Sequence, residues 1–73
     1  MPVTLDNVHD VVSYHQPNQD QVDKIAFIRR EAESFITAII VSTPVCGDQQ
    51  AAIRHVRDAM MSANAAIVLN GAV

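Results

Sequence analysis

The stretch that decides the fold runs from Gln19 to Val41 and has the sequence QDQVDKIAFIRREAESFITAIIV. Five of its apolar residues recur at alternating intervals of three and four, which places them along one face of an α-helix. These residues, the seam of the first helix, are Ile25, Ile28, Ala32, Phe35 and Ile39. Other apolar residues, such as Phe27 and Ile40, lie off the seam. A helix that is apolar on more than one side usually packs against more than one neighbour, so we expect contacts beyond a single partner helix.

The first helix is predicted over residues 18–41. Asn18, followed three positions later by Gln21, forms a capping-box pattern at its start. Pro44 disfavours helical backbone at the residue before it, so the helix should end at about Val41. Two i,i+4 ion pairs, worth about 0.2–0.5 kcal/mol each, are expected on its surface, Asp20–Lys24 and Arg29–Glu33.

A second helix is predicted over residues 47–70, and its apolar residues repeat the spacing of the first seam. They are Ile53, Val56, Met60, Ala63 and Ile67. Cys46 or Gly47 is expected at its N-terminal cap, and Asn70-Gly71 supplies a residue that tolerates positive φ at its end. Two matching seams joined by a short loop predict an all-α fold, an antiparallel helical hairpin.

Residues 1–17 precede the hairpin and leave two alternatives open. Thr4 is a plausible N-cap, and Val8, Val11 and Val12 have helical spacing, which predicts a short helix. An extended arm is the alternative, because the sequence from Val11 to Tyr14 also suits a strand.

The chain of 73 residues forms one domain, 1–73, and is too short to bury a large core. Chains of this size are usually stabilised by disulfides, a metal or self-association. Cys46 is the only cysteine, and it shows no metal-ligand spacing with the three histidines. No cofactor or metal is therefore expected, and self-association into a homo-oligomer is the remaining device.

The net charge of −3 argues against binding to polymeric DNA or RNA, which requires a basic surface. It is compatible with a small anionic ligand held by a few local cations. The N-terminus has no basic region followed by an apolar core, and no apolar run approaches the roughly 20 residues that span a bilayer. We therefore expect a cytoplasmic protein that does not bind membranes.

No catalytic group of residues is visible. The histidines, His9, His15 and His55, have no serine or cysteine nucleophile in a recognisable motif beside them. Glu31 and Glu33 are two positions apart, so on a helix they point to different sides and do not form a carboxylate pair. The sequence gives no reason to expect an enzyme.

One group of residues could bind a nucleotide. Tyr14, His15 and Pro17 lead into a helix that carries Lys24 and Arg29. An aromatic ring can stack on a base, while Lys and Arg neutralise phosphate. The alternative is that Tyr14 packs under the end of the hairpin and the cations are only solvated. Because Lys24 and Arg29 are five residues apart, their directions diverge by well over ~90°, and they could share a ligand only between subunits.

Arg54 and Arg57 form a second candidate anion site. They lie one turn apart on the second helix and share a face. The alternative is an ion pair with Asp58 and contact with solvent.

Two blocks of the sequence resemble a known family. Tyr14-His15-x-Pro17, followed by Gln21, Lys24, Ile28-Arg29, Phe35 and Pro44, and then the block Ala59-Met60-x-x-Ala63-Asn64-Ala65-Ala66-Ile67, are similar to the hairpin domain of phage sponge proteins. Those proteins counter bacterial cyclic-oligonucleotide signalling (CBASS) and the related Thoeris signalling. The resemblance covers about Tyr14 to Val68, and the chain looks like the short anti-CBASS members.

The resemblance implies a phage-encoded, non-enzymatic homohexamer in the host cytoplasm. It would bind cyclic dinucleotides between protomers, and in some members cyclic trinucleotides at separate sites, without degrading them. Tyr14 matches the stacking aromatic, Arg29 or Lys24 the cation at a phosphate, and His15 and Pro17 the pocket wall. The chain departs from the family where the second helix opens, since Val45-Cys46-Gly47-Asp48 replaces Pro-Ser-Arg-Glu. The competing hypothesis is a helical protein–protein interaction module that inhibits a host protein through its apolar faces.

Overall fold

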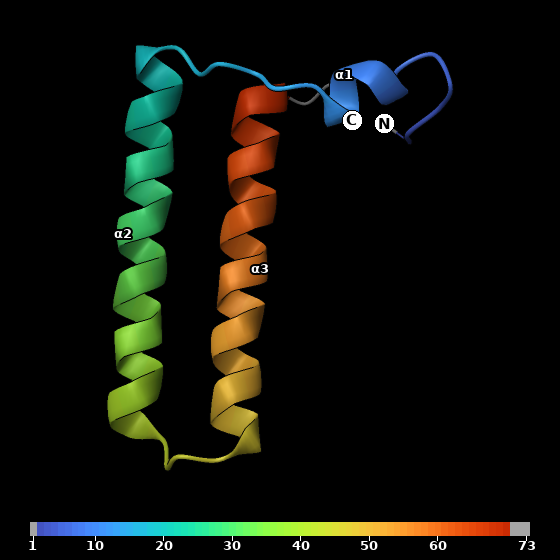
Figure 1. Cartoon of the computed structure of the whole chain (residues 1–73). Helices are drawn as coiled ribbons and strands as arrows, with labels where there is room; N and C mark the ends of the chain where they lie inside the picture. Colours follow the sequence, from blue (N-terminus) through green and yellow to red (C-terminus); the bar gives the residue numbers. More distant parts are fainter. Residues whose placement is uncertain (1, 71–73) are drawn as a thin grey trace.

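The computed structural model describes residues 2–70, which contain three helices and no strand. Helix α1 spans Val8–Val12, α2 spans Gln19–Ser42, and α3 spans Gly47–Leu69. Helices α2 and α3 run antiparallel, side by side, while α1 extends away from the end of the hairpin where α2 begins and α3 ends (Figure 1). The predicted all-α hairpin is confirmed, with long helices whose bounds lie within one residue of those expected.

A capping box fixes the start of α2, as predicted. The Asn18 Oδ1 accepts a hydrogen bond from the Gln21 backbone N–H at 2.9 Å, and the Gln21 Oε1 accepts one from the Asn18 N–H at 3.0 Å. The Gln21 Nε2 also donates to the backbone carbonyl of Ile67 on α3 at 2.9 Å. One glutamine side chain therefore both caps α2 and ties it to the last turns of α3.

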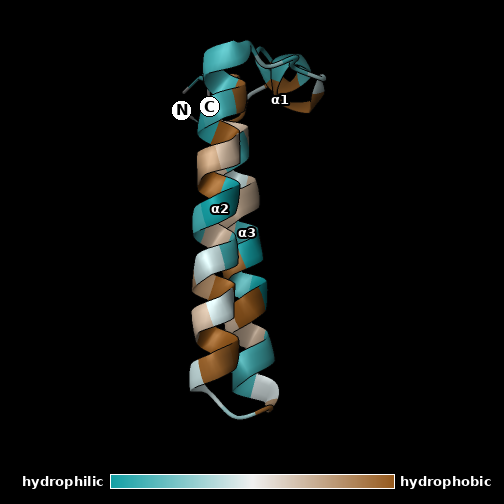
Figure 2. Ribbon diagram, turned by 90° about the vertical axis from the view of Figure 1, so that its left-hand side faces the viewer, coloured by the Kyte–Doolittle hydropathy of each residue, from teal (hydrophilic) through white to brown (hydrophobic). Residues whose placement is uncertain are grey.

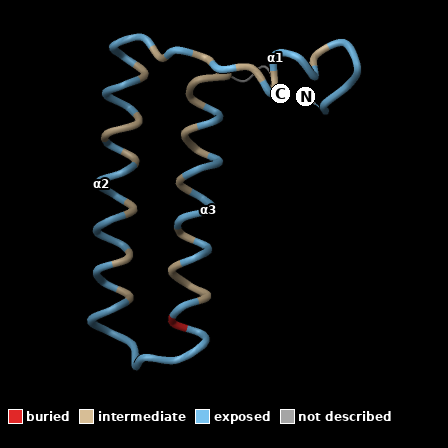
Figure 3. Tube along the Cα trace, viewed as in Figure 1, coloured by how far each residue is buried: buried red, intermediate tan, exposed pale blue. Residues whose placement is uncertain are grey.

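The loop between the two long helices is closed by a glutamine. Cys46 is the N-cap of α3 but makes no side-chain capping bond. Gln49, only 5% exposed, donates from Nε2 to the Thr43 carbonyl at 3.2 Å. It is the one buried residue of the described chain, visible as the red segment in Figure 3. The sequence had given no indication of this role for Gln49.

The seam of α2 departs from the predicted spacing at one position. Ile25, Ile28, Ala32 and Ile39 are half-buried, but Phe35 is 59% exposed and Ile36 is half-buried in its place. At about 100° per residue, Phe35 lies some 80° away from Ile25 around the helix, whereas Ile36 lies only about 20° away. A strict three-four repeat drifts around a straight helix, so an additional interval of four restores the inward face.

The hairpin has no hydrophobic core of its own. No hydrophobic side chain among residues 2–70 is fully buried, and those that face the other long helix are half-buried at most. Hydrophobic residues (brown in Figure 2) occur along both long helices and are not confined to the contact between them. Because the burial of apolar surface is the dominant favourable term in folding, the isolated hairpin gains less of that stabilisation than a fully packed core would give.

The N-terminal segment is a short helix preceded by a turn. The helical alternative is confirmed, but the cap at Thr4 is wrong: the residue before α1 is Asn7, whose Oδ1 accepts a hydrogen bond from the Thr4 N–H at 2.7 Å. The Asn7 side chain thus closes the turn from Thr4 to Asn7, and α1 begins only at Val8.

Two further predictions concern the ends and the ion pairs. Asn70 caps α3 with φ of 51°, as predicted, whereas Gly71 lies outside the described residues. Lys24 and Asp20 form an ion pair at 2.9 Å on the exposed surface of α2. The expected pair of Arg29 with Glu33 does not form, since Lys24–Asp20 is the single ion pair within residues 2–70. An exposed ion pair contributes little to stability, so the absence of the Arg29–Glu33 pair lowers the stability of the fold only slightly.

None of the described helices is both long and apolar enough to cross a bilayer.

Candidate functional site

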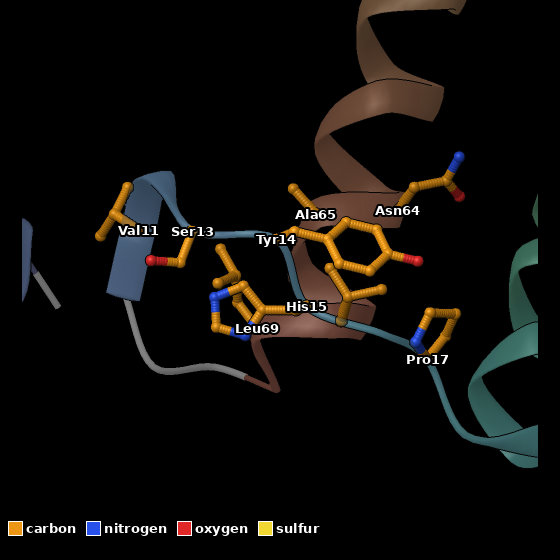
Figure 4. A pocket seen from close by; sticks show the side chains of 9 residues that line it. Val11, Ser13, Tyr14, His15, Pro17, Asn64, Ala65 and Leu69 are labelled. Carbon is orange, nitrogen blue, oxygen red and sulfur yellow. The ribbon is translucent and has the colours of Figure 1, made fainter. Parts of the chain in front are cut away.

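The N-terminal segment and the end of α3 enclose a hollow of about 470 Å³, which we call the tyrosine hollow (Figure 4). It is lined by a residue of α1, by the chain between α1 and α2, and by the last two turns of α3. The lining residues are Val11, Ser13, Tyr14, His15, Pro17, Asn64, Ala65, Val68 and Leu69. Three residues predicted to form a ligand pocket, Tyr14, His15 and Pro17, are thus brought to one place.

Tyr14 supplies the largest aromatic surface of this hollow. Its side chain is 85% exposed, so the alternative in which it packs under the hairpin is wrong. In the view of Figure 4 the Tyr14 ring points away from α1, toward the side on which Asn64 and Pro17 lie. A large, exposed and flat apolar ring beside a cavity is the arrangement on which a nucleobase can stack.

The His15 side chain points away from the Tyr14 ring, and it helps to fix the position of the segment between α1 and α2. In Figure 4 its ring lies toward α1, and its Nε2 is hydrogen-bonded to the backbone carbonyl of Asp10. This bond joins the chain after α1 back onto α1 itself. His15 therefore holds the neighbouring Tyr14 in place and forms one wall of the hollow.

The wall contributed by α3 contains a polar group without a partner. The Oδ1 of Asn64 is buried and accepts no hydrogen bond from any described residue. A buried acceptor left without a donor costs about 1–3 kcal/mol. The residues of this wall were not predicted as site residues, because only the antiparallel return of α3 brings them opposite Tyr14.

The two predicted cations lie outside the tyrosine hollow. Lys24 lines a separate hollow of about 200 Å³ at the start of α2, where it is paired with Asp20. Arg29 lines neither that hollow nor the tyrosine hollow. Within one copy, therefore, neither predicted cation lines the hollow beside the Tyr14 ring.

Arg54 and Arg57 do share a hollow, of about 230 Å³, which we call the arginine hollow. His55, Asp58 and Met61 complete its lining. The alternative in which Arg57 pairs with Asp58 is not observed, because neither arginine takes part in an ion pair within the described chain. Two guanidinium groups one turn apart can bind an anion through several N–H donors.

The described chain offers no group of three or more His, Cys, Asp or Glu side chains placed to hold a metal ion. Cys46 is an exposed free thiol in the loop before α3.

Comparison with models of protein families, with curated proteins and with solved structures finds no match for this chain.

Proposed function

We propose that this protein is a non-enzymatic sponge that binds cyclic oligonucleotide second messengers and keeps them from their receptors. The observation that carries the proposal is the tyrosine hollow, where an exposed aromatic ring stands beside a mostly apolar cavity of about 470 Å³. That volume lies within the roughly 300–1,000 Å³ typical of small-molecule sites. Stacking on Tyr14 would hold one base of the ligand, and the apolar wall of α3 would exclude water around it.

The phosphates of such a ligand require cations that a single copy does not place in this hollow. Arg29 on the exposed surface of α2, or Lys24 five residues before it on the same helix, would approach the phosphates from a neighbouring copy. The site is therefore complete only in a homo-oligomer, for which the family resemblance implies a hexamer. Arg54 and Arg57 in the arginine hollow are the candidates for a second phosphate site, such as one for a cyclic trinucleotide.

The setting proposed for this activity is the cytoplasm of a bacterium infected by the phage that encodes the protein. Binding without cleavage would lower the free concentration of the messenger and so prevent activation of the host effector. A charge of −3 and the scattered cations do not suit a polymeric nucleic acid.

The experiment that tests this proposal identifies what the protein captures. Purified protein is incubated with a mixture of cyclic di- and trinucleotides, washed, and heated to release bound molecules, which are weighed by mass spectrometry. We expect one or more cyclic nucleotides at their intact mass. Linear products would show an enzyme instead, and the absence of any nucleotide would contradict the proposal.

A protein-interaction module is the second candidate, and the twelve large hydrophobic residues that are exposed on the described chain favour it. Such a module would block a host protein through its apolar surface. It would release no nucleotide in the capture experiment above, and it would retain a host protein when incubated with a host lysate.

A further inference from the structure

Asn64 is a polar residue at a position on α3 where neither the helix nor the packing favours one. It lies within the run Ala63-Asn64-Ala65-Ala66, and asparagine forms a helix less readily than alanine. Its Oδ1 is buried and has no hydrogen-bond partner among the described residues. Native proteins leave few buried acceptors in this state, and functional sites are where such departures are expected. The stability of a single chain therefore does not explain why an amide stands here.

Asn64 lies beside the ring on which a base would stack. It lines the tyrosine hollow, and in Figure 4 its carboxamide lies on the side of the hollow toward which the Tyr14 ring points. The Ser13 hydroxyl and the His15 imidazole, which also line the hollow, are hydrogen-bonded to backbone carbonyls of α1. Asn64 is the one polar side chain that α3 adds to the lining. A base stacked on Tyr14 therefore has this amide as its polar neighbour on α3.

The Asn64 oxygen can turn toward the hollow without losing a hydrogen bond. The residue as a whole is half-buried, and the χ2 torsion of an asparagine is soft, so its amide rotates at little cost. Rotation breaks no bond of Oδ1, because this oxygen accepts none from the described residues. A ligand N–H that reaches it satisfies an acceptor that had no other donor, which is where a hydrogen bond contributes most.

We propose that the Asn64 amide recognises the edge of the base that stacks on Tyr14, and that this base is adenine. An amide offers one acceptor and one donor side by side, and adenine offers the complementary pair, the N6 amine and the N7 acceptor. Guanine presents two acceptors at that edge, O6 and N7, and would leave Oδ1 without a donor. The assignment rests on the proposed function, since it names the base that the same hollow selects.

The test compares two ligands that differ only in the donor that Asn64 would bind. One is cyclic di-AMP, and the other is the same cyclic dinucleotide with purine, which lacks the 6-amine, in place of adenine. Both stack and both carry two phosphates. Calorimetric titration should show that the wild-type protein binds cyclic di-AMP about 5- to 150-fold more tightly than the purine analogue. Asn64→Leu should bind the two ligands within a few-fold of each other.

Two further measurements separate recognition of the base from a structural role. Asn64→Leu removes a buried polar group that has no partner, so its thermal unfolding temperature should equal or exceed that of wild type, and its molar mass in solution should be unchanged. Ser62→Ala is the matched control, because Ser62 is an exposed polar residue of α3 that does not line the tyrosine hollow. It should keep the wild-type preference for cyclic di-AMP. Asn64→Ala covers the case in which leucine does not fit, since alanine already occupies the neighbouring positions.

The outcomes distinguish this assignment from the sponge itself. Equal affinity of the wild-type protein for both ligands, or binding of other cyclic dinucleotides but not of cyclic di-AMP, would overturn the assignment and leave the sponge in place. A preference for cyclic di-AMP that survives in Asn64→Leu and Asn64→Ala would overturn it as well, and so would unfolding of both variants. Failure of every cyclic nucleotide to bind the wild-type protein would overturn both proposals.

Discussion

Tyr14 is held in an exposed position by its neighbours along the chain. The His15 imidazole is hydrogen-bonded to the Asp10 carbonyl, which anchors the segment to α1, and Pro17 has a fixed φ and restricts the backbone of the residue before it. The ring of Tyr14 itself makes no hydrogen bond to any of the described residues. A ligand that stacks on this ring therefore meets a surface whose backbone is already ordered, which lowers the entropic cost of binding.

Replacing Tyr14 by Ala should weaken cyclic dinucleotide binding roughly 5- to 150-fold, the loss that corresponds to removing one base–aromatic stack of about 1–3 kcal/mol. Tyr14→Phe keeps the ring and should bind within a few-fold of wild type, because the hydroxyl has no partner to lose. Calorimetric titration gives both affinities. Because Tyr14 is 85% exposed, the helical content of either variant should equal that of wild type. Unchanged affinity in Tyr14→Ala would place the binding site elsewhere.

The pairing of α2 with α3 depends on Gln21, since its amide serves both helices. Gln21→Glu keeps an oxygen that can accept from the Asn18 N–H but loses the donor to the Ile67 carbonyl. We expect it to lower the free energy of unfolding by about 1 kcal/mol, because the Ile67 carbonyl loses one of its two donors, keeps only the Asn70 N–H at 3.3 Å, and faces a carboxylate. Urea unfolding at one fixed protein concentration measures the change.

Gln19 provides the control for this prediction. Its Nε2 donates only to the Asp23 Oδ1, 3.0 Å away on the exposed surface of the same helix. Gln19→Ala should therefore change the stability by no more than about 0.5 kcal/mol. Equal effects of the two substitutions would mean that the tie from Gln21 to Ile67 does not stabilise the hairpin.

The end of α3 is shaped by Asn70, whose φ of 51° lies in the left-handed region. Glycine occupies that region without steric cost, and alanine does so at a cost of about 1 kcal/mol. Thermal unfolding should therefore rank Asn70→Gly as equal to or more stable than wild type and Asn70→Ala as less stable. The opposite order would mean that α3 does not end in this conformation.

At the scale of the whole molecule, the sequence predicted the hairpin because its two seams depend only on local periodicity. It misplaced Phe35, since a strict three-four repeat ignores the drift of a straight helix with 3.6 residues per turn. The tyrosine hollow was predicted from one side only. The α3 wall of the hollow depends on the register of α3 against α2. Contacts such as the hydrogen bond from Gln21 to Ile67 set this register, whereas the two seams alone would also allow α3 to be shifted by one turn.

The thickness of the molecule links its fold to its proposed function. The chain measures 46 × 28 × 17 Å, so its shortest dimension corresponds to a single layer of helices. A single layer cannot bury an apolar face on both sides, and the two cations proposed for the phosphates, Lys24 and Arg29, do not line the hollow beside Tyr14. Both the missing core and the missing phosphate contacts would be supplied by further copies of the same chain.

Native mass spectrometry of the protein mixed with a panel of cyclic di- and trinucleotides tests the central claim most directly, because it weighs the assembly and its ligand together. We predict a homo-oligomer that carries a small whole number of cyclic nucleotides, each at its intact mass. A bare monomer, or an oligomer that carries none of the nucleotides offered, would contradict the account.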